Sequence, residues 1–438
     1  MNKRFVIAAP KSNAGKTTVS LGILRLLKRK GWDVQPFKSG PDYIDPKFHE
    51  IAAGKQGVNL DGFMMSDKDI FTSLADFSEE DTIQCVEGVM GLFDGADKSK
   101  GSTAELAKKI NAPVVLVVDA KSVAYSVAPL IQGFVNFDPD LQIMGVIFNR
   151  VGSPRHYQIL AEACDDIGVK AFGYLRRVKE AEIPSRHLGL NIEGIEKFDQ
   201  SIDRIADEIE QNVDWEGLIT NAKTAEPVSL IPEKIAKKDF RFAVAKDEAF
   251  NFIYPQFIKA MEEIGEVNYF SPLNDDQLPP ADFVYLPGGY PEMHLEKLVK
   301  NQVMITQIKN FAENGGLIFA ECGGMMYLGK QMIDKQGKSF HTVGHFDFST
   351  SIEHPKLYLG YRTIDVNDEQ YKGHEFHYSS IQNHDTEQTV GTIRNARNGA
   401  VNTQLFQKGN VLASYMHFFI GDAKKVEALI QLMLNSKQ

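Results

Sequence analysis

The sequence has little of what marks secreted, membrane-spanning or nucleic-acid-binding proteins. Its three cysteines in 438 residues include no CxxC pair, so neither a disulfide framework nor a zinc site is expected. No segment approaches the ~20 apolar residues that span a bilayer. The formal net charge of -10 opposes binding to nucleic acid or anionic membranes, which attract basic surfaces. We therefore expect a cytoplasmic protein with small-molecule partners, no nucleic acid and no membrane.

The order of the apolar segments predicts two α/β domains. Runs such as RFVIAA, PVVLVVDA and IMGVIFNR alternate with stretches of helical period through about residue 220, a pattern typical of a parallel sheet covered on both faces. The N-terminal run in MNKRFVIAAP is too short for a signal peptide and leads into KSNAGKTT, so we interpret it as the first strand. Residues 221–238 contain two prolines and a lysine cluster, which indicates a linker. We predict domains at residues 1–220 and 239–438.

The segment APKSNAGKTT follows the first predicted strand and precedes a predicted helix, the place where a loop can hold phosphate groups. Gly15, Lys16 and Thr17 fit the pattern GxxxxGK[ST], although Pro10 stands at the first glycine position. The lysine can reach the terminal phosphates, and the threonine hydroxyl can bind Mg²⁺. The candidate nucleotide-binding residues of this loop are Ser12, Asn13, Gly15, Lys16 and Thr17.

Lys11 gives this loop a second interpretation. It stands four residues before Gly15 and also suits the K-x-x-x-G-K-T loop of partitioning-type ATPases. An ordinary solvated loop lysine is the interpretation that we prefer slightly.

Carboxylates near this loop are candidate magnesium ligands, because Mg²⁺ prefers oxygen donors and strand ends commonly supply them. Glu87 ends the apolar run TIQCVEG, before a glycine-rich turn. Asp42 and Asp45 lie in the loop of PFKSGPDYIDP, where capping of a turn competes with metal binding as their role. Cys85, inside the strand, is expected to be a core residue.

Cys322, in FAECGGMMYLG, is a candidate nucleophile. On residue type alone a buried, inert cysteine is the more common outcome. However, GGLIFAE predicts a short buried strand, and a strand, a sharp turn and a helix form the nucleophile elbow. Ala320 replaces the first glycine of that motif. The N-terminus of the following helix favours a thiolate.

Thiol chemistry also needs a base and donors for an oxyanion. His417 follows the strand of VLASYMH and is the candidate base, although a core histidine is the competing interpretation. Gly288 and Gly289 follow the strand of DFVYLPGG and can present a backbone N–H, and Gly323 can present a second. In GHEFHYS, His374 and His377 are only a weak sequence signal for a metal site. We expect this strand to face the substrate or to contact the other domain.

Several strings together closely resemble one family, the glutamine-dependent cobyrinate a,c-diamide synthases of corrinoid biosynthesis. Close relatives act on hydrogenobyrinate or nickel-sirohydrochlorin. The similarity spans nearly the whole chain in order. The strings are VQPFKSGPDYIDPKFH, NLDGFM, VEGVMGLFDG, RHYQILAEAC, IPSRHLGL, YLPGGYPE, AECGGMMYLG, GYR and GHEFHYS.

The resemblance implies a P-loop NTPase-like domain similar to dethiobiotin synthetase, followed by a class I glutamine amidotransferase-like domain. It implies that ATP activates the a and c carboxylates as acyl phosphates, which ammonia from glutamine converts to amides. Lys16 and Thr17 would hold phosphate and Mg²⁺. The other residues that it implicates are Asp45 and Glu87 as metal ligands, Asn149 and Arg150 at the adenine, and Tyr43 and Ile44 at the substrate.

In the second domain the resemblance assigns Cys322 as the nucleophile and His417 as its base. The family usually carries a second histidine two residues later, where this chain has Phe419. An acyl phosphate hydrolyses in water, so we expect a closed path for ammonia between the domains.

A substrate with many carboxylates needs cations in the first domain. The candidates are Lys38, Arg155, His156, Arg176, Arg177, Arg186 and His187.

Three functions remain open at this stage. The first is amidation of cobyrinate, and the second is the same reaction on nickel-sirohydrochlorin. The third is an ATPase switch with an inactive glutaminase-like binding domain, which Lys11 and Phe419 favour mildly and the intact elbow opposes. The sequence does not set the oligomeric state, and a homodimer is one form compatible with it.

Overall fold

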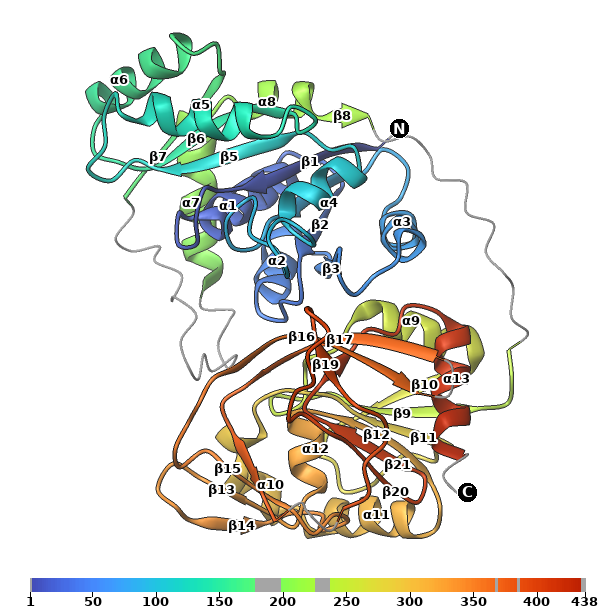
Figure 1. The fold of residues 1–438 in the computed structure, drawn as a ribbon. Helices are drawn as coiled ribbons and strands as arrows, with labels where there is room; N and C mark the ends of the chain where they lie inside the picture. Colours follow the sequence, from blue (N-terminus) through green and yellow to red (C-terminus); the bar gives the residue numbers. More distant parts are fainter. Residues whose placement is uncertain (1, 178–197, 225–236, 367–368, 384–386, 435–438) are drawn as a thin grey trace. The chain divides into compact units, whose positions relative to one another are not determined.

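The computed structural model describes residues 2–177, 198–224, 237–366, 369–383 and 387–434. The chain divides into two compact units, residues 1–231 and 232–438, which are treated separately below (Figure 1). Within the described residues, no helix combines the length and the apolar character needed to cross a membrane.

The first unit is built on one sheet with the neighbour order β3-β2-β4-β1-β5-β6-β7, in which these neighbouring strands are all parallel. Its strands are β1 (Lys3–Ala8), β2 (Val34–Ser39), β3 (Val58–Leu60), β4 (Ile83–Glu87), β5 (Val114–Asp119), β6 (Ile143–Val151), β7 (Ala171–Arg176) and β8 (Lys223–Thr224). Its helices are α1 (Lys16–Arg29), α2 (Asp45–Ala53), α3 (Asp67–Asp76), α4 (Thr103–Lys109), α5 (Val127–Phe137), α6 (Pro154–Asp165), α7 (Asp199–Asn212) and α8 (Trp215–Asn221).

Helices cover both faces of this sheet, as the continuous apolar strands predict. Figure 1 shows α1 and α7 on one face and α5 and α6 on the other. The apolar side of α1, with Val19, Ile23 and Leu27, packs against Ile205 and Ile209 of α7 within one buried core. This packing fixes the N-terminal end of α1 at the carboxyl edge of the sheet, where the phosphate loop lies.

The second unit has a six-stranded central sheet with the order β10-β9-β11-β12-β21-β20, in which only the last pair is antiparallel. Its strands are β9 (Arg241–Ala245), β10 (Glu266–Phe270), β11 (Phe283–Leu286), β12 (Leu317–Glu321), β13 (Gln331–Ile333), β14 (Ser339–His341), β15 (Ser349–Ser351), β16 (Tyr358–Val366), β17 (Glu369–His377), β18 (Ser380–Gln382), β19 (Arg394–Asn395), β20 (Leu405–Lys408), β21 (Val411–Ser414) and β22 (His417–Phe418). Its helices are α9 (Pro255–Ile264), the 3-10 turn η3 (Pro291–Met293), α10 (Leu295–Lys300), α11 (Gln302–Glu313), α12 (Gly323–Leu328) and α13 (Ala423–Leu434).

Two four-stranded sheets accompany the central one, with the orders β14-β13-β15-β18 and β19-β16-β17-β22. In the second of these, β17 pairs antiparallel with β22, so that His374 lies opposite His417. The small sheets therefore bring the strand of GHEFHYS to the candidate base.

The predicted α/β architecture is confirmed in both halves. The predicted linker is described only at its ends, because residues 225–236 lie outside the described residues. At its start, Lys223–Thr224 forms β8, which pairs antiparallel with β1.

Candidate functional site

The phosphate loop connects β1 to α1 in the first unit. Gly15 caps the helix with φ of 98°, a backbone conformation that glycine adopts without strain. A Cβ atom at this position would lie 1.8 Å from Nδ2 of Asn149, so the side chain at the end of β6 excludes any larger residue. Lys16 begins the helix and is buried, and its Nζ donates to the carbonyl of Met90 at 2.5 Å. Lys11, Ser12 and Asn13 are exposed.

Asn149 and Arg150 brace this loop from the end of β6. The amide of Asn149 donates to the carbonyl of Ala14 at 3.0 Å. The guanidinium of Arg150 donates to the carbonyl of Asn13 at 3.0 Å and forms an ion pair with Asp119 at 2.7 Å. Both side chains thus contact the loop itself, and their contact with adenine stays a prediction.

Beside the loop, Thr17 and two carboxylates form a buried cluster. The Thr17 hydroxyl donates to Glu87 at 2.7 Å and lies 3.5 Å from a carboxylate oxygen of Asp45. The ammonium of Lys38 lies between the acids, 2.6 Å from Asp45 and 2.9 Å from Glu87. His49 Nε2 lies 2.7 Å from the other oxygen of Glu87. Burial alone would favour a neutral Glu87, but Lys38 and His49 hold its pKa well below the usual range.

This cluster suits Mg²⁺ by the chemistry of its donors. One hydroxyl and two carboxylates supply the hard oxygen ligands that Mg²⁺ prefers, and the Lys38 ammonium already occupies the cationic position between Asp45 and Glu87. Among the described residues, no group of three or more His, Cys, Asp and Glu side chains is placed to hold a metal ion. Protein ligands for the ion would therefore be Thr17, Asp45 and Glu87, with phosphate oxygens completing the shell.

The loop before α2 holds the remaining candidates of the first unit. Asp42 accepts hydrogen bonds from the backbone N–H of Ile44 at 2.9 Å and of Asp45 at 3.1 Å, so its role is that of a turn cap. Tyr43 is buried and Ile44 is half-buried in the same loop. Their contact with a substrate stays a prediction.

The second unit contains the predicted nucleophile elbow. Strand β12 ends at Glu321, Cys322 has φ of 45° and ψ of -104°, and α12 begins at Gly323. Such a conformation is strained for a residue with a side chain and is typical of functional turns. A hydrogen bond from the N–H of Cys322 to the carbonyl of Ser414, at 2.7 Å, holds this backbone conformation. The turn also packs closely against β11, because a Cβ on Gly324 would lie 2.0 Å from the carbonyl oxygen of Leu286.

The two glycine-containing turns and the candidate base come together at this elbow. A Cβ on Gly323 would lie 3.2 Å from the backbone nitrogen of Gly289. A Cβ on Gly288 would lie 2.3 Å from Cε1 of His417. The loop after β11 therefore lies against both the helix that follows Cys322 and the imidazole of His417, which is where oxyanion donors are needed.

A layer of aromatic rings supports the imidazole of His417. The ring of His374 stacks on it at 4.9 Å and 14°, and the hydroxyl of Tyr254 lies 3.2 Å from Nδ1 of His374. Phe419, at the position of the family's second histidine, is buried with its ring edge-on to Tyr254. An apolar contact thus takes the place of a second imidazole.

The strand of GHEFHYS is buried in the second unit, and its contact with a substrate or with the other domain stays a prediction. His374, Glu375 and His377 are buried, because β17 lies between β16 and β22. Glu375 accepts hydrogen bonds from Arg362 and Thr403, both at 2.6 Å, and contacts His377 Nε2 at 2.7 Å. Burial raises the pKa of this carboxyl, but these partners bring it down to about 2.

Burial keeps both members of the candidate catalytic pair neutral. It raises the pKa of the Cys322 thiol well above its usual range, and the negative charge of Glu292 adds to this effect. It lowers the pKa of His417 well below the usual range, helped by the neighbouring His374. Both shifts oppose a charged pair of thiolate and imidazolium in the protein without substrate.

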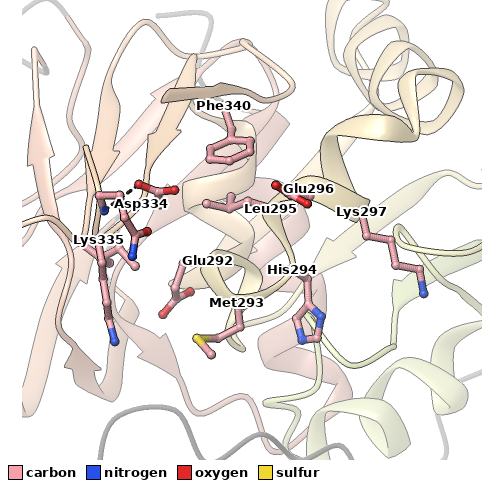
Figure 2. A pocket seen from close by; sticks show the side chains of 11 residues that line it. Glu292, Met293, His294, Leu295, Glu296, Lys297, Asp334, Lys335 and Phe340 are labelled. Atoms are coloured by element: carbon pink, nitrogen blue, oxygen red, sulfur yellow. Dashed lines mark hydrogen bonds between the residues drawn. The ribbon is translucent and has the colours of Figure 1, made fainter. Parts of the chain in front are cut away.

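A cavity of about 460 Å³ lies beside η3 in the second unit (Figure 2). Its walls come from η3, α10 and the hairpin between β13 and β14, together with Ile352. Figure 2 shows Glu292 on η3 facing this space, with Lys335 on the hairpin across from it.

Comparisons with known proteins agree with both halves of the chain. Residues 5–190 match the family of CobQ/CobB/MinD/ParA nucleotide binding domains, and residues 241–425 match the CobB/CobQ-like glutamine amidotransferase domain. A cobyrinate a,c-diamide synthase from Caldanaerobacter subterraneus is 39% identical over 95% of this chain and 95% of its own length. A hydrogenobyrinate a,c-diamide synthase from Brucella abortus is 39% identical over 96% of this chain and all of its own length.

The chain belongs to the cobyrinate and hydrogenobyrinate a,c-diamide synthase family. The sequence pattern located both loops, the elbow and the glycine turns of this chain. It missed the role of Lys38, whose side chain is only 1% exposed and is therefore no surface cation for substrate carboxylates. The sequence signal that could have indicated a buried Lys38 is its position as the one charged residue in the apolar strand VQPFKS.

The remaining candidate cations are spread over the first unit. Arg176 forms an ion pair with Glu208 at 2.6 Å, and His156 Nε2 lies 2.6 Å from the carbonyl of Val123. Arg155 is exposed. Arg186 and His187 lie outside the described residues, and Arg177 is exposed, so a cationic substrate site stays a prediction.

Proposed function

We propose that the chain catalyses ATP-dependent amidation of the a and c carboxylates of cobyrinic acid with ammonia released from glutamine. The observation that carries the proposal is the elbow of Cys322, packed against the Gly288-Gly289 turn and His417, in one chain with a glycine-capped phosphate loop. The family membership supports the same reaction. We assign ATP binding and ligation to residues 1–220 and the glutaminase reaction to residues 239–438, both acting in the cytoplasm.

In the glutaminase reaction, His417 accepts the proton of the Cys322 thiol and the sulfur attacks the carboxamide carbon of glutamine. The backbone N–H groups of Gly289 and Gly323 donate to the oxygen that becomes negative. His417 then returns the proton to the departing nitrogen, so ammonia leaves and a thioester remains. Water, deprotonated by the same imidazole, hydrolyses the thioester to glutamate and regenerates the thiol.

In the ligase reaction, the phosphate loop and Lys16 bind the phosphates of ATP, and Thr17, Asp45 and Glu87 would hold Mg²⁺. The bound cation would offset the negative charge of the phosphates. The substrate carboxylate attacks the γ-phosphorus, which releases ADP and leaves an acyl phosphate. Ammonia attacks the acyl carbon, and phosphate departs from the new amide. Tyr43 and Ile44, in the loop before α2, are proposed to contact the substrate.

The choice of macrocycle is tested with separate incubations. The protein is incubated with ATP, Mg²⁺, glutamine and one of three substrates: cobyrinate, hydrogenobyrinate or nickel-sirohydrochlorin. Mass spectrometry then gives the masses of the products. We expect two amidations of cobyrinate, each replacing one hydroxyl by one amino group. Hydrogenobyrinate is the second candidate, because relatives named for either substrate are equally identical to this chain. Failure to amidate any of the three would contradict the proposal.

An ATPase switch with an inactive second unit predicts different behaviour. Its ATP turnover would depend on a protein partner and would not respond to a carboxylate substrate. The strained elbow at Cys322 supports an active glutaminase instead, because such strain persists where function requires it.

A further inference from the structure

Glu292 is a half-buried residue near the elbow, and the proposed reaction does not use its carboxyl group. Its Oε2 atom is enclosed and has no hydrogen-bond partner among the described residues. A buried oxygen without a hydrogen-bond partner is unfavourable, and more so when it is charged. Such a group in a native structure calls for an explanation, which a functional role or a bound water or ion can supply.

The position of Glu292 ties it to the elbow. It lies in η3, directly after the Gly288-Gly289 turn. Its neighbour Pro291 packs against the start of α12, where a Cβ on Gly323 would lie 2.7 Å from the proline ring. The carboxyl is also close enough to Cys322 for its charge to raise the pKa of the thiol.

The cavity beside Glu292 offers the space for a small ligand. Its volume of about 460 Å³ is within the usual range for small-molecule sites. Lys335 lines the opposite wall (Figure 2), and its charge lowers the pKa of Glu292, yet no ion pair within 4 Å joins these two residues. The carboxyl therefore faces the cavity without a cation of its own. Burial raises the pKa of Glu292 to about 7, because a carboxylate removed from water without a nearby cation is disfavoured.

We propose that Glu292 binds the α-ammonium group of glutamine in this cavity. The inference rests on the proposed glutaminase activity and adds the recognition of the amino acid to it. The α-amino nitrogen of glutamine lies roughly 5 Å from the carboxamide carbon in an extended side chain. A carboxylate beside the elbow can therefore hold the amino end while the sulfur of Cys322 attacks the other. Amides that lack an ammonium group leave Glu292 unpaired and bind less well.

The test compares glutamine with glutaramate, the same molecule without its α-amino group, as substrates of the full-length protein. We expect Glu292→Gln to lower kcat/KM for glutamine roughly 10- to 100-fold, the usual loss for a charge-assisted hydrogen bond. The same change should leave kcat/KM for glutaramate nearly unaltered, so the preference for glutamine shrinks. Ammonia-driven amidation should stay at the wild-type rate, which shows that the variant is folded.

The control is Glu313→Gln, which removes a carboxylate charge from an exposed side chain on α11, outside the cavity. It should leave the preference for glutamine unchanged. Equal losses for glutamine and glutaramate in Glu292→Gln, or no loss for either, would overturn the inference while leaving the glutaminase reaction intact. Wild-type protein that releases ammonia from neither substrate would instead contradict the proposed function, and the inference with it.

Discussion

A methyl group at Gly288 would occupy space that the imidazole of His417 now fills, 2.3 Å from its Cε1 atom. We expect Gly288→Ala to displace the base and lower the glutaminase kcat/KM about 100-fold or more, since an error of about 1 Å in catalytic geometry has that effect. Steady-state hydrolysis of glutamine measures it. Ammonia-driven amidation, which does not need His417, serves as the internal control. Full glutaminase activity in the variant would show that the imidazole works from another position.

His374 makes the stability of the second unit depend on pH. Burial lowers its pKa to about 3, so the unfolded chain takes up a proton below pH 6.5 that the folded chain refuses. Stability from this group is therefore lost as pH falls from about 6.5 towards 3. Between pH 7 and pH 5 the loss is about 2 kcal/mol.

The measurement is the difference between the wild type and His374→Gln, which cannot ionise. Glu321 acts in the opposite direction, because burial raises its pKa to about 8, and only the difference isolates the histidine. Hydrogen exchange of the backbone amides in β17 and β22 reports the local stability. Parallel pH profiles for the two proteins would refute the assignment of a neutral, buried His374.

The backbone geometry of single residues was predictable from the sequence where a local motif fixes it. Gly15 and Cys322 each sit in a turn that demands an unusual φ, and each was located from its strand, turn and helix. His374 and Lys38 were not placed, because their partners come from strands distant in the sequence. Burial and pairing of this kind depend on the register between strands, which a single sequence does not reveal.

At the scale of elements, the contact between α1 and α7 has no spare room. A Cβ on Gly22 of α1 would lie 2.6 Å from a methyl group of Ile205 and 2.9 Å from Ile209 on α7. We expect Gly22→Ala to destabilise the first unit by about 1–3 kcal/mol through overpacking. This cost should exceed the gain of up to about 1 kcal/mol from the better helix propensity of alanine.

Gly133 in α5 offers the matched control. It is exposed, and no atom lies within 4 Å of a Cβ built there. Gly133→Ala should therefore stabilise the unit by about 0.5–1 kcal/mol. Urea unfolding followed by hydrogen exchange in each helix gives both values. A stabilising Gly22→Ala would mean that α7 moves away from α1 at little cost.

The parallel strands were also the elements easiest to predict. Each is a continuous apolar run, so β1, β5, β6 and β12 stand out from their surroundings. The short antiparallel strands β13, β14, β18 and β19 did not, because two or three residues carry no readable period. These strands belong to the two small sheets of the second unit, one of which brings His374 to His417.

At the scale of the whole chain, two substitutions assign one reaction to each unit. Cys322→Ala should abolish glutamine-driven amidation and leave ammonia-driven amidation intact, because only the release of ammonia needs the sulfur. Lys16→Ala should abolish both, since each requires ATP. The products are measured by mass spectrometry with glutamine or an ammonium salt as the nitrogen source. Equal losses with both sources in Cys322→Ala would contradict the separation of the two reactions.

Lys38 neutralises two buried carboxylates of the first unit in the absence of any ligand. Two carboxylates enclosed side by side would repel each other, and the lysine acts as a resident counter-ion that removes this repulsion. The fold around Asp45 and Glu87 can thus form without waiting for a metal. A divalent cation that enters the site must compete with the ammonium group of Lys38 for the same two carboxylates. Metal binding is therefore weaker, but the site folds without a metal.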